Sequence, residues 1–526
     1  MRWDMKFLFL AFVAGLVSAL GFEPLNLWPL TLLAFAGLMW LVQKARRLRT
    51  ALARGWWFGG GQFVLGLNWI ATAFTYQSAM PAWLGWVSVV LLSLYLAIYP
   101  AMAAGLAWRY GRKDRLAFVF IFAAAWIVTE WLRATVFTGF AWNPVGVSLL
   151  PTLTARLSSI VGTYGLSGIV ALLGGTLLLL FERYWKTGVI MAALIVGVSL
   201  ARWGFDQPSV GTPGVPLTIV QPNIGQEVKW SEGYEERNFE RLRSLSSPVD
   251  AGPGAGADAP RLLLWPEAAI TQPLQDGRTD FVSQQGARLT RSRAASLLGP
   301  KDLLLTGGVT LQSSDGVAVS SGTNSVFAMD AGGRVLGRYD KAHLVPYGEY
   351  LPARPILSRL GLSRLAPGAV DFDSGPGPRT LNFAGIGKIG FQLCYEMIFS
   401  GEVVDRRNRP DFLFNPSNDA WFGSWGPPQH LAQARLRAVE EGLPVVRSTP
   451  TGISAVVDAD GEVIASIPWR EQGAIQALLP PAKAPTIFSR LGNLAPFLFA
   501  LFLIGVAVVV HRRAPAHILA REARGR

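Results

Sequence analysis

Long apolar runs divide this chain into a membrane-type part and a polar part. A helix that crosses the ~30 Å hydrocarbon core of a bilayer needs about 20 mostly apolar residues. Eight runs of about this length lie at 7–22, 25–43, 56–76, 82–108, 116–133, 157–181, 187–203 and 493–511. We therefore predict an α-helical transmembrane bundle of about eight helices, seven of which precede residue 204.

The first apolar run follows Arg2 and Lys6 and in this respect resembles a secretory signal peptide. Six further apolar runs follow it before the polar part of the chain begins. For this reason we interpret the first run as an uncleaved first helix.

The polar stretch 204–490 has a different pattern. Its short β-rich runs, bounded by Gly, Pro, Asn or Asp, predict strands at 216–220, 261–264, 303–305, 325–329, 335–339, 388–393, 412–414 and 453–457. Helical stretches at 234–246, 280–295 and 429–441 lie between them. This alternation is typical of an α/β fold with covered sheets. A segment rich in Gly, Ala, Pro and Asp, 247–260, predicts a surface loop.

The positions of Lys and Arg orient the bundle, because cytoplasmic loops carry an excess of basic residues. With the N-terminus in the cytoplasm, the cytoplasmic segments hold 18 basic residues against four acidic ones, whereas the short external loops hold about two. We therefore expect three regions: a seven-helix bundle over 1–203, an extracytoplasmic domain over 204–490, and a final helix with a cytoplasmic tail over 491–526.

Composition agrees with this organisation. The chain has 526 residues, of which 51% are hydrophobic and only 16% are charged, whereas soluble domains carry about 25% charged residues. The formal charge of +13 would suggest a nucleic-acid partner if it formed a surface patch. The cytoplasmic excess of basic residues accounts for the whole of this charge. The net positive charge therefore reflects the membrane topology of the chain, and we expect no nucleic-acid partner.

Cys394 is the only cysteine, so the chain can form no intramolecular disulfide. A lone thiol outside the cytoplasm is either a buried spectator or a nucleophile. Cys394 stands where a predicted strand, 388–393, meets a predicted helix. Such a turn exposes a side chain and aims backbone N–H groups at one point, which is the geometry of an acyl-transfer site.

Three other stretches also place polar groups at strand ends. Glu267 follows an apolar strand that Pro266 terminates, and it is either a solvated turn residue or a general base. Lys341 ends another strand and begins a segment that interleaves aromatic residues with Lys, His and Glu; the alternative is an ordinary surface loop. The stretch 414–423 is a polar turn that ends in bulky aromatic residues.

Together these residue types suit covalent acyl chemistry. A thiol becomes a good nucleophile when a nearby base removes its proton. The carbonyl under attack develops negative charge on oxygen, which an ammonium group and a backbone N–H can stabilise. Glu267, Lys341 and Cys394 supply the base, the cation and the nucleophile.

Other chemistries have little support in the sequence. The four histidines, His343, His430, His511 and His517, lack metal-ligand spacing. A Walker loop is absent, as is a GxGxxG motif after a strand. We expect neither a metal nor a cofactor.

Taken in order, these motifs resemble those of the apolipoprotein N-acyltransferases, membrane members of the nitrilase (carbon–nitrogen hydrolase) superfamily. The resemblance covers essentially the whole chain. It rests on the helix count and on the motifs Gln221-Pro222-Asn223-Ile224, Trp265-Pro266-Glu267, Tyr339-Asp340-Lys341 through Glu349, Leu393-Cys394-Tyr395-Glu396, and 415–422.

The resemblance implies a nitrilase-like α-β-β-α sandwich for the polar region. It also implies roles for individual residues: Glu267 as general base, Lys341 as oxyanion-stabilising cation and Cys394 as nucleophile. Glu349 would orient Lys341, and the amide N–H of Tyr395 would complete the oxyanion hole. Further matching positions, expected to support the site or bind substrate, are Trp230, Asn324 and Glu396.

The implied reaction has two steps. Cys394 takes an acyl chain from a membrane phospholipid and forms a thioester. The α-amino group of the N-terminal diacylglyceryl-cysteine of an apolipoprotein then accepts that chain. This is the last step of lipoprotein maturation, and the resemblance places it at the periplasmic face of the bacterial inner membrane. The expected partners are the phospholipid, the apolipoprotein and the bilayer, and we expect the protein to be a monomer. Residues 351–360 mix apolar residues with Arg, which suits an arm that enters the headgroup layer or a plain surface loop.

Two other functions remain open at this point. A membrane-tethered amidase would use the same three residues but pass the acyl group to water. A transporter or scaffold would place charged groups inside the membrane. Only Glu130 and Arg133 are notable candidates for this, and their spacing favours an interfacial i,i+3 pair.

The basic asymmetry predicts the topology. A reporter that is active only outside the cytoplasm should work when fused after Gln207 and should fail when fused within 46–54. The reverse pattern of reporter activity would contradict the orientation.

Overall fold

The computed structural model describes residues 4–76, 81–205, 208–210, 214–229, 233–247, 260–360 and 371–513. The chain divides into two compact units. The first unit comprises Met1–Asn68, Trp86–Asp206 and Leu491–Arg526, and the second comprises Trp69–Gly85 and Gln207–Arg490.

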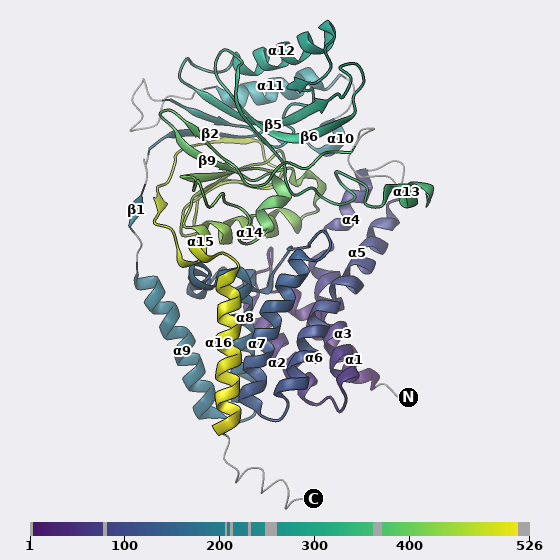
Figure 1. Cartoon of the computed structure of the whole chain (residues 1–526), viewed down its shortest axis with the longest axis vertical. Helices are drawn as coiled ribbons and strands as arrows, with labels where there is room; N and C mark the ends of the chain where they lie inside the picture. Colours follow the sequence, from purple (N-terminus) through teal and green to yellow (C-terminus); the bar gives the residue numbers. More distant parts are fainter. Residues whose placement is uncertain are drawn as a thin grey trace, which may run out of the picture. The chain divides into compact units, whose positions relative to one another are not determined.

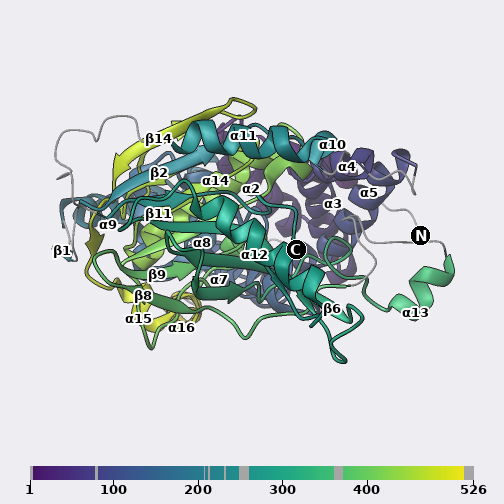
Figure 2. The same ribbon diagram turned by 90° about the horizontal axis from the view of Figure 1, so that it is seen from above.

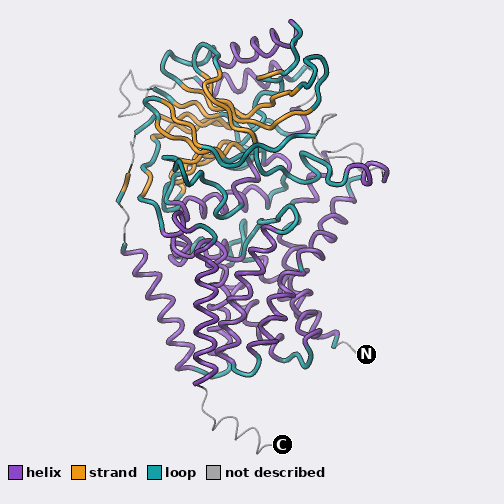
Figure 3. Tube along the Cα trace, in the orientation of Figure 1, coloured by secondary structure: helices purple, strands orange, loops and turns teal. Residues whose placement is uncertain are grey.

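The first unit is built from helices that run side by side (Figures 1 and 3). In the described residues α1 packs on α3, α3 on α6, α6 on α7, and α7 on α8 and α16. The helices are α1 (Met5–Ala19), α2 (Trp28–Gln43), α3 (Leu48–Gly66), α5 (Trp83–Leu96), α6 (Ile98–Gly111), α7 (Arg115–Thr135), α8 (Ser158–Phe181), α9 (Trp185–Gly204) and α16 (Leu494–Arg513), with the 3-10 turns η2 (Val145–Leu149) and η3 (Leu153–Leu157).

Among the described residues, five helices are long and apolar enough to cross a membrane. They are Trp83–Gly111, Arg115–Thr135, Leu153–Phe181, Trp185–Gly204 and Leu494–Arg512, and Met5–Ala19 and Trp28–Gln43 are shorter apolar helices. The prediction of an N-terminal helical bundle is therefore confirmed, with roughly the expected number of helices.

The predicted span 56–76 was wrong in its limits, because α3 begins at Leu48 and ends at Gly66. The basic residues in the first part of α3, Arg49 and Arg54, made this part of the helix resemble a polar loop in the sequence. Arg54 is 4% exposed, and its guanidinium group donates to the carbonyl oxygen of Leu41 inside the unit. A charged residue that a sequence reading assigns to a loop is here part of a packed helix.

Glycine lets α1 and α3 approach each other closely. A Cβ atom added at Gly15 would lie 2.0 Å from the carbonyl oxygen of Phe58, and one added at Gly61 would lie 2.2 Å from that of Phe12. Small residues permit such backbone-to-backbone packing between apolar helices. Neither position can accept a larger residue without separating the two helices.

Glu130 and Arg133 form the predicted i,i+3 pair, with Arg133 Nη2 3.9 Å from Glu130 Oε1. The pair is buried inside the first unit and is not at an exposed interface. Arg133 donates to the carbonyl oxygens of Phe140 and Trp142, and Glu130 accepts from the amide of Val145. These hydrogen bonds stabilise the chain reversal that follows α7. The Glu130–Arg133 pair therefore has a structural role.

The second unit contains two large sheets. The seven-stranded sheet has the order β14 (Gly473–Leu478), β2 (Pro216–Gln221), β3 (Leu262–Leu264), β5 (Leu303–Gln312), β6 (Ser321–Met329) and β7 (Val335–Asp340), with β4 (Gln275–Asp276) beside β5. The six-stranded sheet has the order β13 (Val463–Ile467), β12 (Ser454–Val457), β11 (Val445–Ser448), β10 (Phe412–Pro416), β9 (Gly387–Phe391) and β8 (Thr380–Phe383). A small sheet pairs β1 (Ser209–Val210) with β15 (Ala482–Lys483).

Helices cover the outer faces of both large sheets (Figures 1 and 2). α11 (Glu235–Ser246) and α12 (Phe281–Ala295) cover the seven-stranded sheet, and α14 (Gly426–Glu441) covers the six-stranded one. Short elements complete the described part of the unit: α4 (Ile70–Ala73), η1 (Phe74–Tyr76), α10 (Gln226–Lys229), α13 (Arg354–Leu357), η4 (Ser358–Leu360), η5 (Cys394–Ile398), η6 (Asp419–Trp421) and α15 (Ile487–Leu491).

Successive side chains of a strand point to opposite faces of its sheet, and this alternation forms the layers of the second unit. Leu262 and Leu264 point into the core between the two sheets, whereas Leu263 points to the cluster under α11 and α12. Leu413 of β10 likewise turns away from the central core and packs with Ala438 of α14. Because successive side chains of a strand face opposite sides, three buried leucines in a row require cover on both faces. The predicted α/β fold with covered sheets is confirmed as an α-β-β-α sandwich.

The segment Trp69–Gly85 belongs to the second unit, although all of it except 77–81 was predicted to lie in membrane spans. Its aromatic residues pack on the turn that follows β10. The ring centroids of Trp69 and Phe422 are 4.5 Å apart, and those of Tyr76 and Trp421 are 6.0 Å apart. An apolar composition alone cannot distinguish such a packed segment from the end of a transmembrane helix.

Candidate active site

The ends of several strands bring the candidate residues together. Glu267 lies in the turn after β3, Lys341 directly follows β7, and Cys394 follows β9. β3 is central in the parallel part of one sheet, and β9 pairs in parallel with β10 in the other. Carboxyl ends of parallel strands meet at one edge of a sheet, where α/β proteins place their ligands.

Lys341 is the central charge of the site, with 1% of its side chain exposed. Its ammonium nitrogen lies 2.9 Å from Glu349 Oε2 and 3.8 Å from Glu267 Oε1. Burial alone would lower the pKa of Lys341, but the charges of Glu349 and Glu267 outweigh burial and raise that pKa above its ordinary value. Lys341 therefore stays cationic.

Asn324 of β6 links the two carboxylates. Its Nδ2 donates to Glu267 Oε1 at 2.7 Å and to Glu349 Oε1 at 2.8 Å. The backbone amide of Val345 donates to Glu349 Oε2 at 2.8 Å. Among the described residues, Glu267 Oε2 has no hydrogen-bond partner although it is buried. One carboxylate oxygen is thus fixed and the other is available to accept a proton.

Glu396 joins the lysine loop to the cysteine loop. Its Oε1 accepts from the hydroxyl of Tyr339 at 2.8 Å and from the amides of Ala342 and His343 at 2.7 and 3.0 Å. Its Oε2 accepts from the amide of Leu393 at 2.7 Å. One buried carboxylate therefore sets the distance between the segment after Lys341 and the segment before Cys394.

Cys394 occupies a strained turn. Its φ of 50° lies in the left-handed region, which costs a non-glycine residue about 1–3 kcal/mol. The predicted helix after the strand is the short 3-10 turn η5. Burial and then the charge of Glu267 raise the pKa of the Cys394 thiol well above its ordinary value, while Lys341 acts to lower it. The resting thiol is therefore protonated and needs a base.

A second buried lysine lies beside the general-base candidate. The Nζ of Lys229, on α10, lies 3.5 Å from the backbone carbonyl oxygen of Glu267. Burial lowers the pKa of Lys229 to about 8, against the opposing effect of the Glu267 charge. Lys229 also lines a cavity of about 190 Å³ that reaches Pro266 and Ala268 in the turn that carries Glu267.

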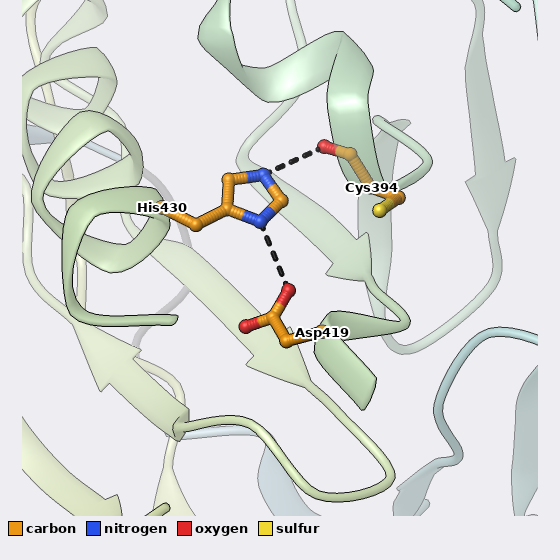
Figure 4. A group of neighbouring side chains, drawn as sticks. All are labelled: Cys394, Asp419 and His430. Carbon is orange, nitrogen blue, oxygen red and sulfur yellow. Dashed lines mark hydrogen bonds and ion pairs between the residues drawn. The ribbon is translucent and has the colours of Figure 1, made fainter. Parts of the chain in front are cut away.

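On its other side Cys394 meets a polar cluster in which a sulfur, a carboxylate oxygen and an imidazole nitrogen lie within 4.8 Å of one another (Figure 4). The other two members are Asp419 and His430. This cluster does not fit a metal ion, because the guanidinium group of Arg447 already fills the place of a cation. Its Nη2 lies 2.8 and 2.7 Å from the Asp419 oxygens and 3.0 Å from His430 Nδ1.

The structure thus brings together seven of the eight residues selected from sequence: Glu267, Asn324, Lys341, Glu349, Cys394, Tyr395 and Glu396. Tyr395 is buried beside the cysteine, and its ring packs against His343 and Phe399. The eighth residue, Trp230, lies outside the described residues, as does most of the predicted loop 247–260.

Sequence reasoning missed Lys229, Asp419, His430 and Arg447 as parts of the site. Asp419 stood in the polar stretch 414–423, so its position after a strand was a usable signal. His430 and Arg447 are far along the chain, and only the packing of α14 and β11 brings them to Asp419.

Comparison with known proteins gives two family matches. A model described as the apolipoprotein N-acyltransferase N-terminal domain matches residues 14–176, and one described as carbon–nitrogen hydrolase matches residues 217–485. The chain is 34% identical to an apolipoprotein N-acyltransferase of Rhodopseudomonas palustris over 98% of its own length and 97% of the relative. It is also 34% identical to that of Bradyrhizobium diazoefficiens, with 98% and 96% covered.

Among solved structures, one that resembles the chain is Saccharomyces cerevisiae Nit3, a member of branch 10 of the nitrilase superfamily. The two share 18% identity with a TM-score of 0.36, over 52% of this chain and 93% of Nit3.

The raised thiol pKa predicts a specific pH dependence of Cys394 alkylation. A pKa above the neutral range leaves the thiol protonated, so the reactive thiolate increases as pH rises. In the wild type Glu267 can accept the proton internally, and the rate of reaction with iodoacetamide should change little between about pH 6 and 8. In Glu267→Gln that route is gone, and the rate should rise roughly tenfold per pH unit.

The extent of alkylation can be measured from the intact mass of the protein, because Cys394 is the only cysteine. The Cys394→Ala variant serves as the blank. N-acetylcysteine, treated in parallel, corrects for the reagent. Equal slopes in the wild type and Glu267→Gln would remove Glu267 as the proton acceptor.

Proposed function

The chain belongs to the apolipoprotein N-acyltransferase family, and on this basis we propose that it transfers a fatty acyl chain from a membrane phospholipid to an apolipoprotein. The acceptor is the α-amino group of the N-terminal diacylglyceryl-cysteine. The observation that carries the proposal is the buried set of Glu267, Lys341 and Cys394, in which the base keeps one oxygen unbonded among the described residues.

In the first step Glu267 Oε2 takes the proton of the Cys394 thiol while the sulfur attacks an ester carbonyl carbon of the phospholipid. A C–S bond forms, and negative charge moves to the carbonyl oxygen. Lys341 and the amide of Tyr395 stabilise that charge, a contribution typically worth 10²–10³-fold in rate per donor. The C–O bond then breaks, and the lysophospholipid leaves with the proton from Glu267.

In the second step the amine nitrogen attacks the thioester. An N–C bond forms, the C–S bond breaks, and the amine loses one proton to Glu267. That proton returns to the sulfur and restores the thiol. Because the acyl group waits on the enzyme between two substrates, the kinetics are ping-pong.

Both substrates are held at a membrane surface, which increases their effective concentration near an enzyme anchored in the same bilayer. We place the protein in the bacterial inner membrane with its second unit in the periplasm. The apolar helices support membrane insertion, and the orientation rests on the predicted excess of basic residues in cytoplasmic segments, which stays large when the buried Arg54 is set aside.

Hydrolysis is the second candidate function, because the family model that spans residues 217–485 is named for carbon–nitrogen hydrolases. The same three residues would then pass the acyl group to water. A transferase must protect its thioester from water until the amine arrives, whereas a hydrolase need not. The lifetime of the acyl-enzyme therefore separates the two functions.

Purified protein incubated with phospholipid alone should gain the mass of one fatty acyl group, and Cys394→Ala should gain none. Neutral hydroxylamine should remove that mass, because it cleaves thioesters. A diacylglyceryl peptide with a free N-terminal amine should discharge the enzyme into an N-acyl product. The same peptide with an acetylated amine is the matched control and should leave the enzyme loaded.

Two results would contradict this proposal. Steady release of free fatty acid with no acyl-enzyme would make water the acceptor. Acylation of Cys394→Ala at the wild-type rate would remove the cysteine from the reaction.

A further inference from the structure

His430 contacts the backbone of the nucleophile. Its Nε2 lies 3.0 Å from the carbonyl oxygen of Cys394, and its Nδ1 lies 2.9 Å from Asp419 Oδ1 (Figure 4). The imidazole ring is fully buried, as are Asp419 and Arg447. The ring thus bridges an anchored carboxylate and the strained turn of the cysteine.

The surroundings of the ring place a hydrogen on Nε2. Burial and the charge of Arg447 lower the pKa of His430, which favours the neutral ring, although Asp419 acts in the opposite direction. The carbonyl oxygen of Cys394 only accepts, so its bond with Nε2 needs a hydrogen on that nitrogen. In the neutral ring with this hydrogen, Nδ1 accepts from Arg447 Nη2 at 3.0 Å but sets a lone pair against Asp419 Oδ1 at 2.9 Å. In the protonated ring the Nδ1–H donates to Asp419 Oδ1 instead, and the Nε2 hydrogen is retained. The remaining form, neutral with its hydrogen on Nδ1, would set a lone pair against the Cys394 carbonyl oxygen.

The carbonyl of Cys394 and the amide N–H of Tyr395 belong to the same peptide group. A trans peptide is planar, so its C=O and N–H point in opposite directions and turn together. A hydrogen bond that fixes the Cys394 carbonyl therefore also fixes the direction of the Tyr395 N–H. The φ of 50° at Cys394 makes this restraint important, because the unrestrained turn would relax to a less strained conformation.

We propose that His430 is a positioning residue that orients the oxyanion-hole amide of Tyr395 by holding the Cys394 carbonyl. This inference rests on the proposed function, in which that amide stabilises the tetrahedral intermediate. Asp419 and Arg447 anchor the ring from behind. The ring of Phe422, whose centroid is 5.8 Å from that of His430, packs beside it.

Two amide substitutions at His430 distinguish the contact of Nε2 with Cys394 from the contact of Nδ1 with Asp419. In His430→Gln the terminal NH₂ group can reach the position of Nε2 and donate to Cys394. In His430→Asn the shorter side chain reaches only the position of Nδ1, so the contact with Asp419 can persist and the bond to Cys394 is lost. Both variants replace a buried imidazole by a buried amide, and their thermal midpoints should be similar.

The expected kinetic result follows from the loss of one aligned donor. At saturating phospholipid, His430→Asn should form the acyl-enzyme roughly 10- to 100-fold more slowly than the wild type, with little change in apparent KM. His430→Gln should recover most of that rate. Equal losses in both variants, or no loss in His430→Asn, would overturn the proposal.

A spectroscopic measurement tests the hydrogen bond without turnover. Cysteine labelled with ¹³C at its carbonyl marks a single peptide group, because the chain has one cysteine. The infrared band of that carbonyl should lie at the same frequency in the wild type and His430→Gln, and at a higher frequency in His430→Asn. An unchanged band in His430→Asn would show that no such bond exists.

If neither variant folds, the wild-type protein still decides the question. With ¹³C-labelled cysteine and ¹⁵N-labelled histidine, solid-state NMR should show the marked carbonyl close to a protonated imidazole nitrogen. An unprotonated nitrogen there would overturn the proposal. Failure of the proposed function would give a different result. The Cys394→Ala variant would remain active, whereas the wild type would still show the hydrogen bond between His430 and the Cys394 carbonyl.

Discussion

The burial of the Lys341 ammonium group between two carboxylates is the constraint on which the rest of the site depends. An isolated ion costs several kcal/mol to remove from water, and the cost is recovered only if partners and hydrogen bonds are well placed. Glu349 and Glu267 supply the partners, and Asn324 fixes both carboxylates with one amide group. These requirements determine where the loops after β3 and β7 can lie. They also leave Glu267 Oε2 without a hydrogen-bond partner among the described residues.

The sandwich makes this arrangement rigid. Each participating segment begins at a strand end inside a two-layer core, and Glu396 links the Lys341 loop to the turn of Cys394. The strained cysteine is then restrained from both sides, by Glu396 at the preceding amide and by His430 at its own carbonyl. Only a thiolate oxidises readily, so burial and protonation at rest protect the Cys394 thiol from adventitious oxidation.

Much of this organisation could be predicted from the sequence because it is encoded locally. Apolar length predicted the helices, and alternation with turn residues predicted all eight strands that were named. Seven of the described strands were missed: β1, β4 and β15 have only two residues each, β8, β13 and β14 are partly exposed, and β11 carries Arg447. Glu267, Lys341 and Cys394 were found because each stands at the end of an apolar run.

The remaining features depend on contacts between distant segments. Arg54 and Arg447 are buried charges that look like surface residues until their partners are known. Most of the segment Trp69–Gly85 was predicted to lie in membrane spans because its aromatic partners, Trp421 and Phe422, are hundreds of residues away in the sequence. His430 offered no pattern in the sequence, and its importance follows only from the carbonyl and the carboxylate that it contacts.

The central claim is that Lys341 both holds the buried carboxylates together and acts in catalysis, and a pair of variants separates these roles. Lys341→Met leaves Glu349 and Glu267 without their cation and should lower the thermal midpoint, since breaking a buried ion pair costs about 3–5 kcal/mol. Adding Glu349→Gln removes one uncompensated charge and should restore much of that stability. The rate of acyl-enzyme formation should nevertheless stay about 10²–10³-fold below the wild type in both variants. Recovery of the wild-type rate in the stabilised double variant would show that Lys341 is only structural and would contradict the account.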